Sequence, residues 1–258
     1  MRNLFRESIA RGEHCLGTFS CLGSGSAIEA LAYTGMDFVI IDAEHGPFEA
    51  EHVQDLIRAA ELHRITPFVR VKDSERASIL KMLDVGAKAL VIPQIYSSDQ
   101  VKEVVMHGKY YPIGKRGFAL GRTSGYGNKS FARENGIPGY FEHCNRETLL
   151  FPQCETMGCL EEIEAIVSID GVDGIFVGPY DLSIALGHPG ELDTPEFQSA
   201  IDRILAAVRG AGKIAIMFTS APGDVSLYIQ MGFQAVTLAT DIQLLITQTK
   251  KLLSSLKT

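Results

Sequence analysis

The stretch LLFPQCETMGCLEEIEAIVSIDGVDGIFVGPYDLSIAL, residues 149–186, decides the fold. Its two apolar runs, 150–155 and 174–178, are continuous rather than alternating, as in strands that are covered on both faces. Between the runs, apolar residues recur three and four apart, as in an amphipathic helix: Leu160, Ile163, Ile166 and Val167. The stretch therefore predicts a strand–helix–strand unit of a parallel sheet.

The same alternation fills nearly the whole chain and predicts eight strands, each followed by a helical pattern. At 258 residues the length suits one barrel of this kind, which takes about 250 residues. We therefore predict an α/β fold, a (β/α)8 TIM barrel with a parallel eight-stranded sheet, over a single domain of residues 1–258. A doubly wound sheet is the alternative, but no GxGxxG fingerprint supports it. The predicted strands are 16–21, 38–42, 67–71, 89–93, 150–155, 174–178, 213–218 and 235–239.

Two segments do not follow this alternation of strands and helices. Residues 1–14 are amphipathic and charged, which predicts a helix across the bottom of the barrel. Residues 109–148 form an extended loop region, rich in Gly, Arg, Tyr and Ser, between the fourth and fifth units. This region could cover the active site, form a subunit contact or be a plain surface excursion.

Bulk composition excludes several classes of function. A net charge of −7 argues against nucleic acid or an anionic membrane as a partner. No apolar run approaches the roughly 20 residues of a membrane span, and the N-terminus lacks the apolar core of a signal peptide. Five cysteines without paired spacing imply no disulfide framework. We expect a cytoplasmic protein that binds small molecules.

Polar residues gather where predicted strands end, which in a barrel is the catalytic face. Glu155 and Asp181 follow neighbouring strands with no cysteine or histidine beside them, a pattern that favours a hard divalent cation such as Mg²⁺ or Mn²⁺. Either acid alone could instead cap the following helix. Both together, with Gln153, favour the metal site.

His45 is the candidate general base, because imidazole titrates near neutral pH. Asp42 could orient it, and Asp84 is the other possible partner. Arg70, in an otherwise apolar strand, needs an anion: either an oxyanion that develops during catalysis, or Asp42 or Glu44 in a structural ion pair.

Two further basic features are weaker candidates. Lys72 shares the strand parity of Arg70, so a Schiff-base lysine is not excluded by spacing, although a solvated loop lysine is favoured. GKRG (114–117) could bind an anion or be a plain turn.

At these residues the sequence resembles the HpcH/HpaI family of metal-dependent pyruvate aldolases, which act on 4-hydroxy-2-oxo acids and 2-keto-3-deoxy sugar acids. The resemblance runs over essentially the whole chain. It is carried by IDAEHGP, PFVRV, KMLDVGAKALVIP, GKRG, PQCET and GIFVGPYDLSIALGHPG. It implies a (β/α)8 barrel, a homo-oligomer that is often a hexamer with an exchanged last helix, and a divalent cofactor (Mg²⁺, Mn²⁺ or Co²⁺).

The resemblance also implies roles for individual residues. His45 matches the catalytic base and Arg70 the residue that stabilises the enolate. Asp84 matches the acid that makes the histidine more basic, which leaves Asp42 near the aldehyde pocket. The remaining matches are the metal ligands Glu155 and Asp181 and the substrate contacts Gln153 and the backbone at Tyr180.

The expected reaction is the reversible cleavage of a 4-hydroxy-2-oxo acid to pyruvate, or a related 2-oxo acid, and an aldehyde. The alternative is an acyl-CoA lyase of the citrate lyase beta or malyl-CoA lyase type. It would need a basic groove for nucleotide phosphates, for which the candidates are Lys115, Arg116 and Arg122. A non-catalytic sensor of 2-oxo acids is a third possibility. MFTSAPGD and VTLATD depart from the family pattern and are expected to shape the aldehyde pocket.

Overall fold

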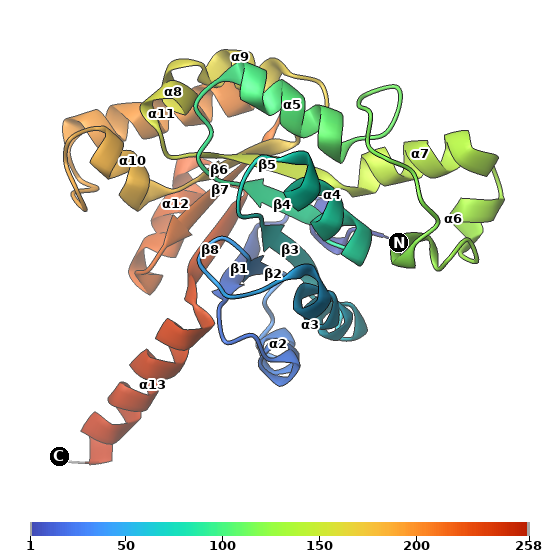
Figure 1. Cartoon of the computed structure of the whole chain (residues 1–258). Coiled ribbons are helices and arrows are strands. Elements are labelled where there is room, and N and C mark those ends of the chain that lie inside the picture. The colour runs from blue at the N-terminus through green and yellow to red at the C-terminus, as the bar shows by residue number, and fades with distance from the viewer. Residues whose placement is uncertain (1, 257–258) are drawn as a thin grey trace.

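A computed structural model describes residues 2–256, so residues 1, 257 and 258 of the predicted domain lie outside the described part of the chain. Eight parallel strands pair in chain order, and β8 closes on β1 to form a barrel (Figure 1). The predicted (β/α)8 fold is confirmed, and every predicted strand overlaps an observed one. The strands are β1 Cys15–Ser20, β2 Phe38–Asp42, β3 Thr66–Arg70, β4 Ala89–Ile92, β5 Leu149–Cys154, β6 Gly174–Val177, β7 Ile214–Thr219 and β8 Ala235–Thr240.

Helices surround the barrel and connect one strand to the next (Figure 1). Among residues 2–256, no helix has the length and apolar character needed to cross a bilayer. The α-helices are α1 Leu4–Ala10, α2 Gly25–Ala32, α3 Ala50–Leu62, α4 Arg76–Val85, α5 Ser98–Gly108, α6 Ser130–Arg133, α7 Gly136–Glu147, α8 Met157–Glu161, α9 Ile163–Ser168, α10 Pro179–Ala185, α11 Pro195–Gly210, α12 Val225–Met231 and α13 Asp241–Leu256. The 3-10 helices are η1 Arg122–Ser124 and η2 Pro222–Asp224.

The alternation of side chains along each strand builds two separate cores. One fills the barrel and includes Phe38, Ile40 and Phe68. The other lies between sheet and helices and includes Val39 and Ile41. Because the inward series on β2 reaches Asp42 and that on β3 reaches Arg70, the top layer of the barrel interior is polar.

Helix α1 closes the bottom of the barrel, as the sequence predicted. Its Phe5 is fully buried and meets the rings of Phe38, Phe68 and Phe151 edge-on, with centroids 5.3, 4.9 and 6.3 Å away. Phe5, only three positions after the first described residue, thus completes the barrel core, and this end of the barrel supports stability rather than catalysis.

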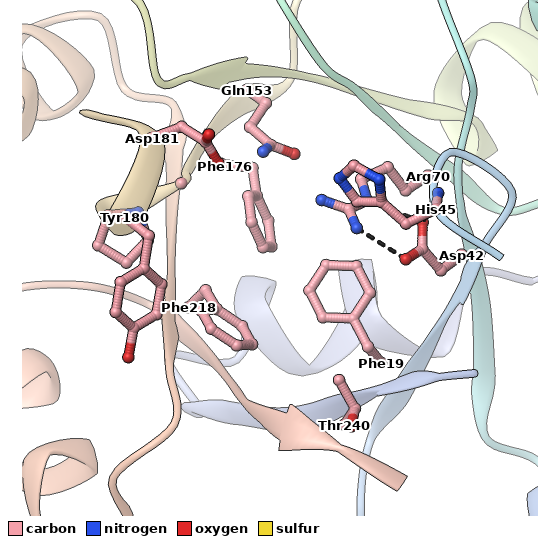
Figure 2. Close-up of a pocket in the computed structure, with 12 residues that line it drawn as sticks. Phe19, Asp42, His45, Arg70, Gln153, Phe176, Tyr180, Asp181, Phe218 and Thr240 are labelled. Carbon is pink, nitrogen blue, oxygen red and sulfur yellow. Dashed lines mark hydrogen bonds and ion pairs between the residues drawn. The ribbon is translucent and has the colours of Figure 1, made fainter. Parts of the chain in front are cut away.

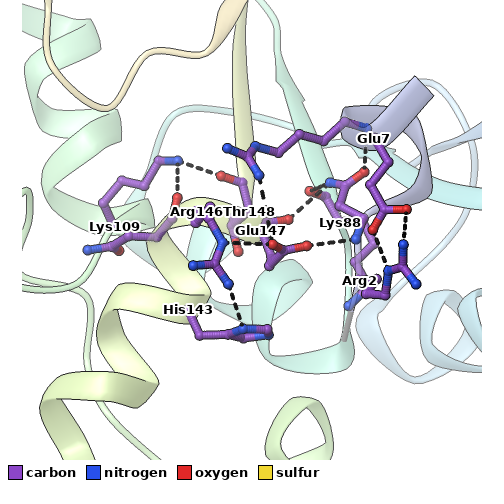
Figure 3. A network of polar contacts seen from close by, with 11 residues as sticks. Arg2, Glu7, Lys88, Lys109, His143, Arg146, Glu147 and Thr148 are labelled. Atoms are coloured by element: carbon purple, nitrogen blue, oxygen red, sulfur yellow. Dashed lines mark hydrogen bonds and ion pairs between the residues drawn. The ribbon is translucent and has the colours of Figure 1, made fainter. Parts of the chain in front are cut away.

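The segment 109–148 is not one extended loop, because it contains η1, α6 and α7. Figure 3 shows the polar contacts that fasten its end to the N-terminus. The backbone N–H of Asn3 donates to Glu147 Oε2 (2.8 Å), and its side-chain amide donates to the carbonyl of Lys88 (3.1 Å). The buried Lys109 forms an ion pair with Asp173 (2.8 Å). These contacts lie at the bottom of the barrel, near the starts of β4 and β5.

Replacing Phe5 by Ala should lower the free energy of unfolding by about 3–5 kcal/mol, because it opens a cavity among three packed rings. Urea unfolding followed by circular dichroism measures the change. Leu62→Ala, at a side chain that is 78% exposed, is the control and should stay within about 0.5 kcal/mol of the native protein. Equal effects of the two changes would contradict the role of α1 as a plug.

Candidate active site

A cavity of about 190 Å³ opens at the C-terminal mouth of the barrel. Figure 2 shows Asp181 and Tyr180 across the cavity from His45, Arg70 and Asp42. The structure thus gathers six of the sequence-predicted site residues around one hollow, although they come from four different strand ends. The polar lining residues predicted from sequence are Asp42, His45, Arg70, Gln153, Tyr180 and Asp181.

Asp42 and Arg70 form the central ion pair of the mouth. They lie opposite each other in the register of β2 and β3. Arg70 Nε donates to Asp42 Oδ1 (2.9 Å) and Nη2 donates to Oδ2 (2.7 Å), which is the two-pronged geometry of a strong charge-assisted pair. Asp42 is 3% exposed and also accepts the backbone N–H groups of Glu44 (3.2 Å) and His45 (3.3 Å). One carboxylate therefore fixes both the cation and the start of the loop.

Arg70 stays charged in this setting. Burial lowers the pKa of its guanidinium, but the hydrogen bonds to Asp42 and the charges of Asp42 and Glu44 outweigh burial and hold the pKa above its usual value. Glu44 Oε2 lies 3.2 Å from Arg70 Nε but accepts no hydrogen bond from a described residue. Burial raises the pKa of Glu44, and Arg70 opposes that rise. The structural ion pair and a catalytic cation are thus compatible readings of Arg70.

His45 is exposed at the rim, in the short loop between β2 and α3. In Figure 2 its imidazole lies beside the Arg70 guanidinium, on the same side of the cavity as Asp42. Because its backbone N–H is held by Asp42, the ring sits on an anchored segment while its nitrogens face the cavity. This arrangement suits a group that exchanges protons with a bound molecule.

Glu155 lies behind the cavity wall, 3% exposed, just after β5. Its Oε1 accepts the backbone N–H (2.8 Å) and side-chain amide (3.1 Å) of Gln94, and its Oε2 accepts the amide of Gln153. Burial raises the pKa of Glu155, and the charges of Asp181 and Glu44 raise it further. Three acids thus act electrostatically on one another at this side of the mouth.

The lack of a side chain at Gly178 leaves room for the Glu155 carboxylate and the Gln153 amide. A Cβ atom at Gly178 would lie 2.7 Å from Glu155 Oε2 and 2.9 Å from Gln153 Nε2. Asp181 follows at once in the first turn of α10, exposed and lining the cavity. Glycine just after β6 therefore leaves the space that the Glu155 carboxylate and the Gln153 amide occupy.

The donor set fits a hard divalent cation. Glu155 and Asp181 supply carboxylates, and the buried carbonyl oxygen Gln153 Oε1 has no hydrogen-bond partner. Oxygen ligands of this kind suit Mg²⁺ or Mn²⁺, which retain several positions for water and substrate. Within residues 2–256, no three His, Cys, Asp or Glu side chains lie close enough to hold a metal by themselves.

Part of the cavity wall is aromatic, and sequence analysis did not single out its Phe19 and Phe176, whereas Phe218 belongs to MFTSAPGD, which was expected to shape the aldehyde pocket. Phe19 packs edge-on against Phe176 and Phe218, with centroids 6.0 and 5.6 Å away, and Phe218 continues to Tyr180 at 6.2 Å. The Arg70 guanidinium lies 4.6 Å from the Phe19 ring centroid. Strand parity was the available signal, because Phe19, Phe176 and Phe218 occupy inward positions near strand ends.

Gln94 was also missed. It follows β4, directly after the VIP run, with a left-handed φ of +53° that is uncommon for a residue with a side chain. Its side chain also accepts a hydrogen bond from the Tyr96 hydroxyl (2.8 Å). The strand-end rule that selected Gln153 applies equally to Gln94, and strained backbone of this kind concentrates at functional sites.

The structure does not bring Asp84 to the mouth. Asp84 lies at the C-terminal end of α4, where the chain turns back into the start of β4, so it is at the opposite end of the barrel from His45. Its Oδ1 accepts a hydrogen bond from Arg116 Nη2 (2.8 Å). Within one chain Asp42 is therefore the acid beside His45, the alternative that spacing alone had left open.

The basic candidates are likewise placed away from the mouth. The Arg116 side chain, 3% exposed, is paired with Asp84, and Arg122 is paired with Glu61. GKRG is thus a buried structural turn on its arginine side. Lys72 lies outside the barrel between α3 and α4 and does not line the mouth. Within the described part of the chain, no lysine lines this cavity that could form a Schiff base there.

Glu155→Gln should raise the free energy of unfolding at pH 7 in the presence of chelator. A carboxyl group whose pKa is raised by folding costs stability once the pH exceeds its unfolded pKa, and this cost is fully present above the folded pKa. The gain should therefore disappear as the pH falls below about 4. Urea unfolding at several pH values measures it.

The exposed Glu191 provides the control, since Glu191→Gln should leave the pH profile unchanged. A Glu155→Gln protein that is less stable than the native chain at pH 7 would contradict the account of Glu155 as a buried, mutually repelled acid.

Comparison with known proteins agrees with this geometry. A family model described as HpcH/HpaI aldolase/citrate lyase matches residues 16–248. The chain is 32% identical over 257 residues to a hydroxypyruvate/pyruvate aldolase of Roseobacter denitrificans, covering 99% of this chain and 97% of that protein. It is 31% identical over 244 residues to a 2-keto-3-deoxy-L-rhamnonate aldolase of Klebsiella pneumoniae, covering 95% and 89%.

A solved structure is similar over the same length. The crystal structure of an HpcH/HpaI aldolase/citrate lyase family protein from Burkholderia cenocepacia J2315 superposes with a TM-score of 0.90 at 30% identity, covering 99% of this chain and 100% of that one. The chain therefore belongs to the HpcH/HpaI aldolase/citrate lyase family, as its motifs predicted, and is a carbon–carbon lyase.

Proposed function

We propose that the barrel mouth catalyses a metal-dependent, class II aldol reaction, the reversible cleavage of a 4-hydroxy-2-oxo acid to pyruvate, or a related 2-oxo acid, and an aldehyde. The observation that carries the proposal is two groups of polar residues that line one cavity, Gln153 and Asp181 in one group and His45 and Arg70 in the other. The buried Glu155 lies behind Gln153, whose amide donates to its carboxylate. Charge stabilisation and proton transfer are thus available within one site.

The ligands we assign are Glu155 and Asp181, for Mg²⁺, Mn²⁺ or Co²⁺. When bound, such an ion supplies Lewis acidity that polarises the keto group of the substrate. Gln153, with its unpaired carbonyl oxygen, lies between this position and the cavity. The backbone N–H of Tyr180, in the first turn of α10, has no partner within its helix and can donate to the substrate carboxylate.

Arg70 stabilises negative charge as it develops on the keto oxygen. Its guanidinium is held on one edge by Asp42 and packed on Phe19, so it need not reorganise when the charge appears. His45 moves the proton of the C4 hydroxyl during cleavage and returns it during addition. The Asp42 carboxylate positions both residues, because it accepts hydrogen bonds from the side chain of Arg70 and from the backbone N–H of His45.

The aldehyde half of the cavity is the aromatic wall. Phe19, Phe218 and Tyr180 line it, and the Tyr180 hydroxyl shares a hydrogen bond with Ser220 (2.7 Å). Arg70 is the only arginine or lysine among the described residues that line this cavity. An acyl-CoA lyase is disfavoured, because the arginines considered for nucleotide phosphates are paired with acids at the opposite end of the barrel.

Two measurements test the mechanism. Exchange of the pyruvate methyl protons with solvent, followed by NMR in D2O, should require a divalent metal and cease with chelator or with Glu155→Gln. Cleavage of a 4-hydroxy-2-oxo acid should fall about 10²–10⁴-fold in His45→Ala, the range for loss of a general base. His188→Ala, at a partly exposed histidine outside the cavity, is the matched control. Full exchange of the pyruvate methyl protons after removal of the metal would refute the proposal.

We also propose that the protein is a homo-oligomer, a hexamer by family resemblance. Helix α13 extends away from the barrel (Figure 1) and carries exposed apolar side chains that a partner would cover, among them Leu245 (59% exposed) and Leu252 (65%).

Changing Leu245 and Leu252 together to Glu should convert the oligomer to smaller species, because charges would be buried at the contact. Light scattering coupled to size exclusion measures the mass. Lys250→Glu, a charge change on the same helix, is the control. A native protein that runs as a monomer would contradict the oligomer directly.

A further inference from the structure

A second cavity, of about 240 Å³, lies outside the barrel between α3 and α4. Both helices begin at the catalytic end, so the cavity opens beside the mouth but is lined by different residues. Its inner wall is apolar and includes Ala43, Phe48, Val71 and Met82, all at most 9% exposed. A hydrocarbon group a few carbons long would bury apolar surface there.

The rim of this cavity is positively biased. Lys72 and Lys81 line it, with Glu49 as the acid among the lining residues. The N-termini of two helices also meet there: α3 begins after Glu49 and α4 begins after Glu75, and neither N-cap side chain caps its helix. Unsatisfied N–H groups and two lysines against one lining carboxylate favour an anion.

An unpaired buried hydroxyl marks the same place. Ser78, in the first turn of α4, is 6% exposed and lines the cavity, and its Oγ has no hydrogen-bond partner among residues 2–256. A serine inside a helix usually bonds back to a carbonyl four residues earlier or faces solvent. Ser78 does neither, and a buried hydroxyl without a partner is costly. A bound acceptor would satisfy it.

The cavity shares its walls with the catalytic mouth. Successive strand residues point to opposite faces, so Asp42 faces the mouth while Ala43 faces this cavity, and Arg70 faces the mouth while Val71 faces this cavity. Phe48 lies in the loop that carries His45. Any molecule that packs on this wall therefore bears on the segments that hold the central ion pair.

We propose that this cavity is an effector site for a small organic anion, a carboxylate or phosphate monoester with a short apolar body, and that its occupancy is coupled to 2-oxo acid binding in the mouth. The head group accepts hydrogen bonds from Ser78 and from the helix N-termini, and pairs with Lys72 and Lys81. The apolar body packs on Val71 and Met82.

Calorimetric titration of the full chain with n-butyl phosphate tests the site, with butyrate, inorganic phosphate and n-butanol as the comparison probes. We expect n-butyl phosphate or butyrate to bind more tightly than inorganic phosphate or n-butanol, and the tighter of the two identifies the head group. Lys81→Gln should weaken binding by up to about fivefold, the range for an exposed ion pair. Lys102→Gln, at an exposed lysine on α5, should not.

Ser78→Ala separates ligand loss from unfolding. It removes an unpaired hydroxyl and introduces a better helix former, so its melting temperature should not fall while its affinity for the probe does. Binding that is equal in the native chain, Ser78→Ala and Lys81→Gln would place the anion elsewhere and overturn the proposal. These results do not depend on aldolase activity.

The coupling arm rests on the proposed function. Titrations of n-butyl phosphate with and without saturating pyruvate and Mg²⁺ should give different affinities, and by linkage the probe must change pyruvate affinity by the same factor. Identical affinities would overturn the coupling. Loss of pyruvate binding with intact probe binding would instead refute the proposed function and leave the anion site standing.

Discussion

The two-pronged pair between Asp42 and Arg70 is the contact on which the mouth of the barrel depends. It exists because β2 and β3 run parallel in a register that sets these residues opposite each other at their ends. A buried guanidinium without a carboxylate would be strongly destabilising, and the reverse holds as well. With both present, the cation remains charged, and the backbone N–H groups of Glu44 and His45 are drawn to the same acid. The strand register, the charge of Arg70 and the position of His45 are therefore linked through this one ion pair.

Across the cavity the situation is the opposite, because like charges are gathered rather than paired. The pKa of Glu155 is raised first by burial and then by the charges of Asp181 and Glu44, while the described donors to its oxygens are Gln94 and Gln153. Such an arrangement lowers the stability of the folded chain. Natural proteins retain destabilising features of this kind where function needs them. A divalent cation would attract these carboxylates and so offset their mutual repulsion. The asymmetry between a paired side and an unpaired side is therefore the physical reason to place the metal beside Glu155 and the proton transfer beside His45.

The barrel could be predicted from the sequence because one pattern, an apolar strand followed by an amphipathic helix, is repeated eight times. The same pattern shows where each strand ends, and polar residues at those ends are the candidates for the active site. Asp42, Arg70, Gln153 and Asp181 were found in this way, since each lies at a strand end or just beyond it. Gln94 obeys the rule too, but no acid stands beside it in the sequence, as Glu155 does beside Gln153, and so it was passed over. Asp84 illustrates the limit, because a helix-end acid beside a glycine has no strand parity, and its partner Arg116 comes from the irregular segment 109–148. The helices inside that segment were equally unpredictable, since its composition suggests loop and its order comes from tertiary contacts such as those of Lys109.

Successive residues of a strand in a closed barrel point in turn to the barrel interior and to the surrounding helices, so each strand contributes to two chemical environments. On β2 the inward residues end at Asp42, whereas the outward series continues to Ala43 on the wall that the cavity between α3 and α4 uses. Packed interiors transmit displacement because they contain little free volume. A change of contacts at Ala43 or Val71 therefore reaches Asp42 or Arg70 through a single peptide unit, without any rearrangement of the barrel. Since the Asp42–Arg70 pair is held by two short hydrogen bonds with directional requirements, it is the element of the mouth most sensitive to a small shift of either strand end.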